Sequence, residues 1–273
     1  MAASFLPEDQ FRRMLAALAR KKNLILAGPP GVGKTFLARQ LALAHAGEAA
    51  RVAFVAFHPS YSYEDFVQGY RPTETGFARR DGLFFDFARR ATDDPRRPYA
   101  FVIDEINRAN LSKVLGELFT LIDADQRGEA FAIPLMYARH PGETFFVPPN
   151  LAILGTMNTA DRSLALVDFA LRRRFAFIEL KPLFGEPAFR EAMRARGVPE
   201  KLLRAMVKLN AGIAADANLG AGFAVGHSYF CAPTPDCEVI VAEEIAPLLR
   251  EYWFDDPARA EAEIRKLADD SGA

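Results

Sequence analysis

The residues with the clearest chemical meaning form a glycine-rich octapeptide near the start of the chain. It reads GPPGVGKT over residues 28–35 and fits the pattern G-x-x-x-x-G-K-[ST], in which backbone N–H groups converge on phosphate oxygens. A helix that begins at Lys34 would direct the positive end of its dipole at the same phosphate oxygens. Lys34 is then expected to neutralise the β- and γ-phosphates, and the Thr35 hydroxyl to bind Mg²⁺. The predicted nucleotide-binding residues of this segment are Gly28, Pro29, Pro30, Gly31, Val32, Gly33, Lys34, Thr35 and Phe36.

An acidic pair follows an apolar segment later in the chain. The residues YAFVI at 99–103 end in Asp104 and Glu105. Carboxylates at the carboxyl end of a strand beside the octapeptide strand reach the same edge of the sheet. There Asp104 is placed to hold the magnesium shell and Glu105 to polarise the attacking water as a general base. An acidic pair alone is most often a solvated loop, so the catalytic interpretation depends on the octapeptide.

An amide occupies a similar position after another apolar segment. Asn158 lies just beyond the predicted strand LAILGT at 151–156. If this strand lies between the first and third strands, its end points at the γ-phosphate and Asn158 can position the lytic water. An asparagine in an ordinary turn is the alternative.

Three consecutive arginines, Arg172–Arg174, precede the last predicted strand. A run of charge is usually a solvated face. We place these arginines at the end of a helix on the ligand edge of the sheet, where they are poorly directed at their own nucleotide. They can instead reach the γ-phosphate of a neighbouring subunit as arginine fingers acting in trans, which implies a ring.

Alternating helical and strand-like segments are needed to position these residues, and they predict an α/β fold with a parallel sheet of five strands between helices. The octapeptide is expected to join the first strand to a helix over 34–45, and Asn110 to cap a helix over 111–121. Residues 133–146 are expected to form a hairpin or surface loop. The predicted strands are 23–27, 51–57, 99–103, 151–156 and 175–180.

After Pro182 the pattern becomes helical, with several helices opening at a proline. We therefore expect a large αβ domain over residues 1–184 and a helical lid domain over residues 185–273. The predicted lid helices are 187–196, 199–214, 238–246, 247–254 and 257–267.

The composition restricts the class of protein. The 273 residues carry 34 Lys and Arg against 35 Asp and Glu, and this balance gives no global attraction for nucleic acid, although a local basic rim remains possible. The two cysteines, Cys231 and Cys237, offer neither a disulfide framework nor a zinc site. No apolar stretch is long enough to cross a membrane, and the start lacks a secretory signal. We expect a cytoplasmic protein.

Taken together, these motifs resemble the AAA+ superfamily, and within it the McrB-type GTPase motors of modification-dependent restriction systems. The resemblance implies a hexameric ring of αβ domains with helical lids and GTP in preference to ATP. It also implies an McrC-type nuclease subunit that stimulates hydrolysis, with DNA contacted indirectly through the complex. The segments that carry it are 28–35, 57–66, 69–72, 103–113, 157–163, 170–175, 226–230 and 251–255.

The same resemblance assigns roles to single residues. Asp104 and Glu105 become the Walker B pair, Asn158 becomes sensor 1, and Arg173 or Arg174 becomes the finger. Asp161 is expected to orient Arg162, a further candidate catalytic residue, or the finger. In the lid, His227 and Ser228 are candidate nucleotide contacts, although a lone histidine is more often structural.

Three matters stay open at this stage. The base is expected between the residues before Asn23 and the lid near 222–228, so GTP follows from the resemblance and from no identified contact. An ATP-dependent remodeller of the MoxR type, or a nucleotide-gated scaffold, would share the fold. McrB-type proteins usually carry an amino-terminal DNA-reading domain, whereas about 22 residues precede the first strand here, as in an excised motor or a short subunit.

Overall fold

A parallel sheet of five strands forms the centre of the molecule. The computed structural model describes residues 5–161 and 169–272. The strand order is β2-β5-β8-β1-β9, which confirms the α/β class and places β8 between β1 and β5. The strands are β1 (Asn23–Gly28), β2 (Val52–Ala56), β5 (Tyr99–Asp104), β8 (Leu151–Asn158) and β9 (Ala176–Glu179).

Helices cover both faces of this sheet, because successive side chains of a strand point to opposite faces. Leu24 and Leu26 pack on one face with α1 (Glu8–Lys21) and α2 (Lys34–Ala46). Ile25 packs on the other face with a second apolar cluster. The helices of that cluster are α3 (Tyr63–Phe66), α4 (Leu83–Asp93), α5 (Leu111–Leu115) and α6 (Leu118–Leu121), and α7 (Phe169–Arg174) precedes β9.

The single helix predicted over 111–121 is wrong, because the structure has two short helices there. α5 ends before Gly116, whose φ of 53° departs from helical geometry, and α6 begins at Leu118. A Cβ at position 116 would lie 3.0 Å from the Tyr63 ring, so the helix break lets α3 pack closely against this segment. The leucine spacing correctly indicated the buried side chains but not the turn between them.

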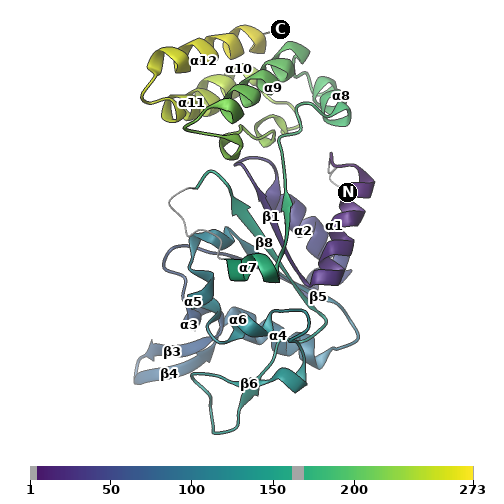
Figure 1. Ribbon diagram of the computed structural model, residues 1–273, viewed down its shortest axis with the longest axis vertical. Coiled ribbons are helices and arrows are strands. Elements are labelled where there is room, and N and C mark those ends of the chain that lie inside the picture. The colour runs from purple at the N-terminus through teal and green to yellow at the C-terminus, as the bar shows by residue number, and fades with distance from the viewer. Residues whose placement is uncertain (1–4, 162–168, 273) are drawn as a thin grey trace.

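Two small hairpins lie at the end of the αβ part that is remote from the lid (Figure 1). The hairpin of β3 (Gln68–Thr73) and β4 (Gly76–Asp81) was not predicted, whereas β6 (Ile133–Pro134) and β7 (Thr144–Phe145) form the hairpin expected within 133–146. Arg79 donates a hydrogen bond of 2.6 Å from Nε to the carbonyl of Tyr137, so the two hairpins are joined.

The lid has an apolar core of its own, formed by side chains from Phe184 onward. It lies above the sheet in Figure 1, and the ring of Phe5 from the amino-terminal segment packs edge-on against Phe189 of the lid. Its helices are α8 (Pro187–Ala195), α9 (Glu200–Ala215), α10 (Cys237–Val239), a π-helix (Ile240–Ile245), α11 (Ala246–Tyr252) and α12 (Pro257–Ser271). In the part of the chain described, none of the helices has the length and apolarity that crossing a bilayer requires.

Candidate functional site

The carboxyl ends of β1, β5 and β8 bring the predicted chemical residues together. In the parallel register Gly28 of β1 lies opposite Asn158 of β8, and β8 pairs with β5 on its other side. The octapeptide then turns into α2, with Gly31 and Gly33 both at positive φ. The backbone of 28–35, the acidic pair and the amide therefore meet at one edge of the sheet.

Thr35 and Asp104 form one corner of this site. The Thr35 Oγ1 hydroxyl donates a hydrogen bond of 2.8 Å to Asp104 Oδ1, and Thr156 Oγ1 donates to the same oxygen. Hydroxyl and carboxylate oxygens are the ligands that Mg²⁺ prefers, with substrate phosphates and water completing its shell. The Thr35 and Asp104 oxygens therefore fit a magnesium ion that is shared with phosphates; among the described residues, no group of three or more His, Cys, Asp or Glu side chains could hold a metal ion.

Thr156 was missed by the sequence analysis. It lies two residues before Asn158 on β8, and a period of two places both side chains on the same face of the strand. Its hydroxyl also accepts a hydrogen bond of 3.1 Å from the backbone N–H of Glu105. The sequence signal that could have identified Thr156 is a hydroxyl side chain two residues before Asn158, the candidate sensor residue.

Glu105 has a left-handed backbone, with φ 53° and ψ 45°. Such a conformation is uncommon for a residue with a Cβ, and it turns the chain sharply at the end of β5. The Asn158 Nδ2 amide donates a hydrogen bond of 2.6 Å to Glu105 Oε1. The other oxygen, Oε2, is buried, lies 3.5 Å from Arg108 Nε and accepts no hydrogen bond from any described residue. The carboxylate is therefore oriented by one amide and retains an acceptor for water.

Lys34 lies within the octapeptide loop that it is expected to serve. Its Nζ donates hydrogen bonds of 3.0 and 2.8 Å to the carbonyls of Gly28 and Pro29. Burial lowers the pKa of Lys34 to about 8, although the negative charges of Glu105, Asp104 and Asp161 oppose this shift. The ammonium group is thus held among backbone oxygens, where an anionic ligand would stabilise its charged form.

Nucleotide binding is expected to weaken as the pH rises above 8. Bound phosphates raise the pKa of Lys34, so binding requires a proton that the free protein loses above its own pKa of about 8. Linkage predicts a Kd about tenfold higher at pH 9 than at pH 7. Titration of a fluorescent nucleotide at constant Mg²⁺ over this range measures it, with circular dichroism to verify the fold. An unchanged Kd for the intact chain, or the same trend in Lys34→Ala, would contradict this assignment.

The lid touches the octapeptide directly. The backbone N–H of Ser228 donates a hydrogen bond of 2.8 Å to the carbonyl of Gly31. A Cβ at Gly226 would lie 2.0 Å from the carbonyl carbon of Gly31, so only glycine permits this approach. The backbone of the lid therefore contacts the octapeptide loop beside the predicted nucleotide-binding site.

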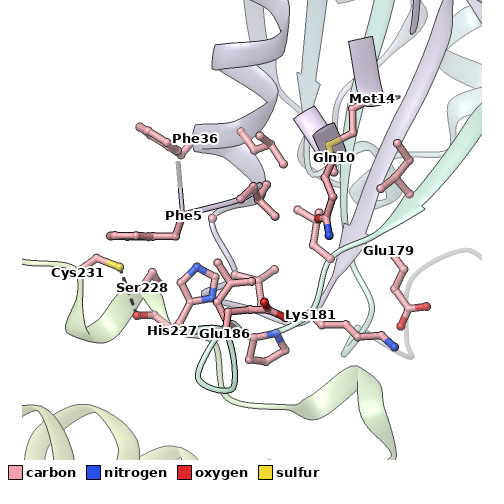
Figure 2. A pocket seen from close by; sticks show the side chains of 18 of the residues that line it. Phe5, Gln10, Met14, Phe36, Glu179, Lys181, Glu186, His227, Ser228 and Cys231 are labelled. Carbon is pink, nitrogen blue, oxygen red and sulfur yellow. Dashed lines mark hydrogen bonds between the residues drawn. The ribbon is translucent and has the colours of Figure 1, made fainter. Parts of the chain in front are cut away.

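A cavity of about 790 Å³ opens beside this contact, between the amino-terminal segment, α2 and the lid (Figure 2). It lies where the sequence analysis expected the base. Phe36 is partly exposed at its wall, and His227 also lines it. Its labelled lining side chains in Figure 2 are Phe5, Gln10, Met14, Phe36, Glu179, Lys181, Glu186, His227, Ser228 and Cys231.

The histidine at this cavity is neutral and has a defined tautomer. Burial lowers the pKa of His227 to about 4. Its Nδ1 accepts a hydrogen bond of 3.3 Å from the backbone N–H of Leu183, so the ring proton resides on Nε2. His227, which lines the cavity, can therefore donate a hydrogen bond from Nε2 but cannot accept one there.

The three arginines are not on the ligand edge, and that part of the sequence analysis is wrong. They precede β9, and a residue before a parallel strand lies at its amino end, opposite the phosphate loop. Asn23, the first residue of β1, donates a hydrogen bond of 3.0 Å from Nδ2 to the carbonyl of Arg174. The six residues of β1 separate this point from Gly28 by roughly 17 Å.

The arginines also differ in exposure. Arg174 is buried, with its guanidinium 4.2 Å from the Phe119 ring centroid, whereas the Arg173 side chain is 75% exposed. Arg172 is exposed and lies 5.5 Å from the Phe177 ring centroid. Arg162 lies outside the described residues, and Asp161 is 3.9 Å from Arg108.

Comparison with known proteins gives the same arrangement a family context. A model described as AAA domain (dynein-related subfamily) matches residues 23–175, and one described as McrB, alpha-helical lid domain, matches residues 201–261. The chain is 51% identical to the Type IV methyl-directed restriction enzyme EcoKMcrB subunit of Escherichia coli K12, over 98% of this chain and 61% of that protein. It is 30% identical to the Type II restriction enzyme BsuMI component YdiS of Bacillus subtilis 168, over 57% of this chain and 56% of that protein. The chain thus spans less than two thirds of either relative.

Proposed function

The chain belongs to the AAA domain family, in its dynein-related subfamily, and carries an McrB-type helical lid; on this basis we propose that it hydrolyses nucleoside triphosphates and prefers GTP to ATP. The observation that carries the proposal is the hydrogen-bonded set at the end of the sheet. Thr35 is joined to Asp104, and Asn158 is joined to Glu105. One pair has the chemistry to bind a metal and the other to activate water.

In the proposed reaction, Lys34 and the backbone of 28–35 bind the β- and γ-phosphates. Thr35 and Asp104 would hold Mg²⁺, which neutralises charge on the phosphate oxygens when bound. Glu105 accepts a proton from a water molecule while the oxygen of that water attacks the γ-phosphorus. The bond between the γ-phosphorus and the β–γ bridging oxygen then breaks. Asn158 keeps the Glu105 carboxylate oriented, and the products are the nucleoside diphosphate and inorganic phosphate.

The preference for GTP is supported by the resemblance to McrB and by the cavity. His227 lines this cavity and keeps its Nε2–H as a donor; set against position 6 of a purine, such a donor would meet an oxygen acceptor in guanine and an amino group in adenine. Gly226 and Ser228 keep this part of the lid against the phosphate loop. We propose a nucleotide-binding domain over residues 1–184 and a lid over residues 185–273, with Phe184 at the end of the first domain packing into the apolar core of the lid.

We further propose a hexameric ring in which Arg173 serves the nucleotide of the neighbouring subunit. Its distance from its own phosphate loop and its exposure support this role. By similarity to the EcoKMcrB subunit, the ring would drive an McrC-like nuclease partner and contact DNA through that complex, in a restriction system. An ATP-dependent remodeller of the MoxR type is the alternative.

Phosphate release from GTP and ATP, assayed side by side with and without an McrC-type partner, tests the function. We expect a higher kcat/KM for GTP and a further rise when the partner is added. Faster turnover of ATP would remove the GTP preference and favour the MoxR-type alternative. No release from either nucleotide, in a preparation that binds both, would leave only a nucleotide-gated scaffold.

A further inference from the structure

Asp123 lies beside the end of α7, the helix that carries the three arginines, where α7 meets the rest of the αβ domain. It directly follows Ile122, after the end of α6, and is only 8% exposed. One of its carboxylate oxygens, Oδ2, is 3.3 Å from Arg174 Nε and 3.4 Å from an Arg173 terminal nitrogen. A single buried oxygen thus contacts both candidate fingers.

The backbone around this carboxylate is also fixed. Asn23 donates hydrogen bonds from Nδ2 to the carbonyls of Ile122 (2.7 Å) and Arg174 (3.0 Å). The buried Arg127 donates to Asn23 Oδ1 at 2.6 Å and to the Ile122 carbonyl at 3.0 Å. Asp123 and the end of α7 are therefore held side by side at the amino end of β1.

The two contacts of Asp123 differ in burial: Arg173 donates a hydrogen bond to it from a mostly exposed side chain, and Arg174 forms an ion pair with it inside the domain. The Arg174 pair is buried, and its guanidinium also packs against Phe119, so this pair fixes the end of α7. The Arg173 pair is mostly exposed, and exposed pairs are weak and exchange readily. A nucleotide phosphate with several negative charges can displace Asp123 from Arg173 while Arg174 stays in place.

We propose that Asp123 is a positioning residue for the trans-acting finger: it anchors the end of α7 through Arg174, so that the exposed Arg173 can reach the neighbouring subunit when a phosphate displaces it from Asp123. This inference rests on the proposed function, because it needs hydrolysis and a finger acting across a subunit interface. Asp123 touches no nucleotide of its own subunit, since it lies at the sheet edge opposite the phosphate loop. Its substitution damages the finger that a subunit offers and leaves that subunit's own site intact.

Asp123→Asn tests the role of the charge. We expect kcat for GTP to fall about 10- to 100-fold, as for other residues that orient a catalytic group, while KM changes less than twofold. Asp123→Glu keeps the charge and should recover most of the loss. Asp125→Asn, an exposed carboxylate two residues away, is the matched control and should behave as the wild type. A rise in KM with unchanged kcat would overturn the proposal.

Mixed rings separate a finger defect from a defect in the subunit's own site. Subunits with Asp123→Asn have an intact site, and subunits with Glu105→Gln have an intact finger. In equimolar random rings about a quarter of the interfaces combine the two, so turnover should exceed the mean of the separate preparations. Arg173→Ala mixed with Glu105→Gln is the reference and should show the same gain.

The outcomes distinguish this inference from the proposed function. A gain with Arg173→Ala but none with Asp123→Asn shows that Asp123 acts within its own subunit, which overturns the inference alone. No gain in either mixture overturns the trans finger, and the inference falls with it. If Asp123→Asn does not fold, Asp123→Glu is mixed instead. The expected gain is then smaller, in proportion to the part of the loss in kcat that this variant does not recover, and a residual loss in kcat without any gain in the mixture would overturn the inference.

Discussion

Replacing Glu105 with Gln is expected to abolish most nucleotide hydrolysis while nucleotide binding persists. The amide has nearly the shape of the carboxylate and can still accept the hydrogen bond from Asn158 Nδ2 through its oxygen. It cannot take a proton from water, and loss of a general base costs about 10²- to 10⁴-fold in kcat. Single-turnover phosphate release measures the chemical step, and titration with a fluorescent nucleotide measures Kd, which should change less than twofold.

The matched control is Glu74→Gln, which makes the same replacement at an exposed position between β3 and β4. It should leave both kcat and Kd unchanged. Because the nucleotide stays bound in Glu105→Gln, this variant should also retain the ring longer after GTP addition, as sedimentation velocity can show. Unchanged turnover in Glu105→Gln would mean that another group activates the water.

The arrangement of the candidate site was largely predictable because parallel strands impose a simple geometry. The carboxyl ends of adjacent strands share one edge, so a phosphate loop after β1, an acidic pair after β5 and an amide at the end of β8 must meet. The structure confirms that Thr35, Asp104 and Asn158 converge. Taken singly, the acidic pair and the amide left a solvated loop and an ordinary turn as alternatives, and it was the octapeptide that favoured a shared site.

What escaped prediction depends on contacts between distant segments. The break at Gly116 follows from packing against Tyr63, and the surroundings of Asp123 combine residues 23, 122–127 and 174. The hydrophobic periodicity of a single segment does not indicate which distant segments will contact it. The misplaced arginines are a different case, because their position before β9 already implied the amino end of the sheet.

Arg173→Ala is expected to reduce kcat about 10³-fold or more, the usual effect of removing an arginine finger. The Arg173 side chain is 75% exposed, and its ion pair with Asp123 contributes little to the fold. Its loss should therefore leave the unfolding temperature and the nucleotide Kd near those of the wild type. Steady-state phosphate release, thermal unfolding and nucleotide titration on one preparation measure the three quantities.

The neighbouring arginines provide the contrast that identifies the finger. Arg174→Ala removes a buried ion pair with Asp123 and should lower the free energy of unfolding by about 3 kcal/mol, because a buried carboxylate loses one of its positively charged partners. Arg172→Ala removes an exposed side chain and should change neither stability nor turnover appreciably. If Arg174→Ala instead abolished turnover at unchanged stability while Arg173→Ala remained active, the finger would be Arg174. In that case the buried guanidinium would have to leave both Asp123 and Phe119 when the ring assembles, and the role proposed for Asp123 would reverse from support to restraint.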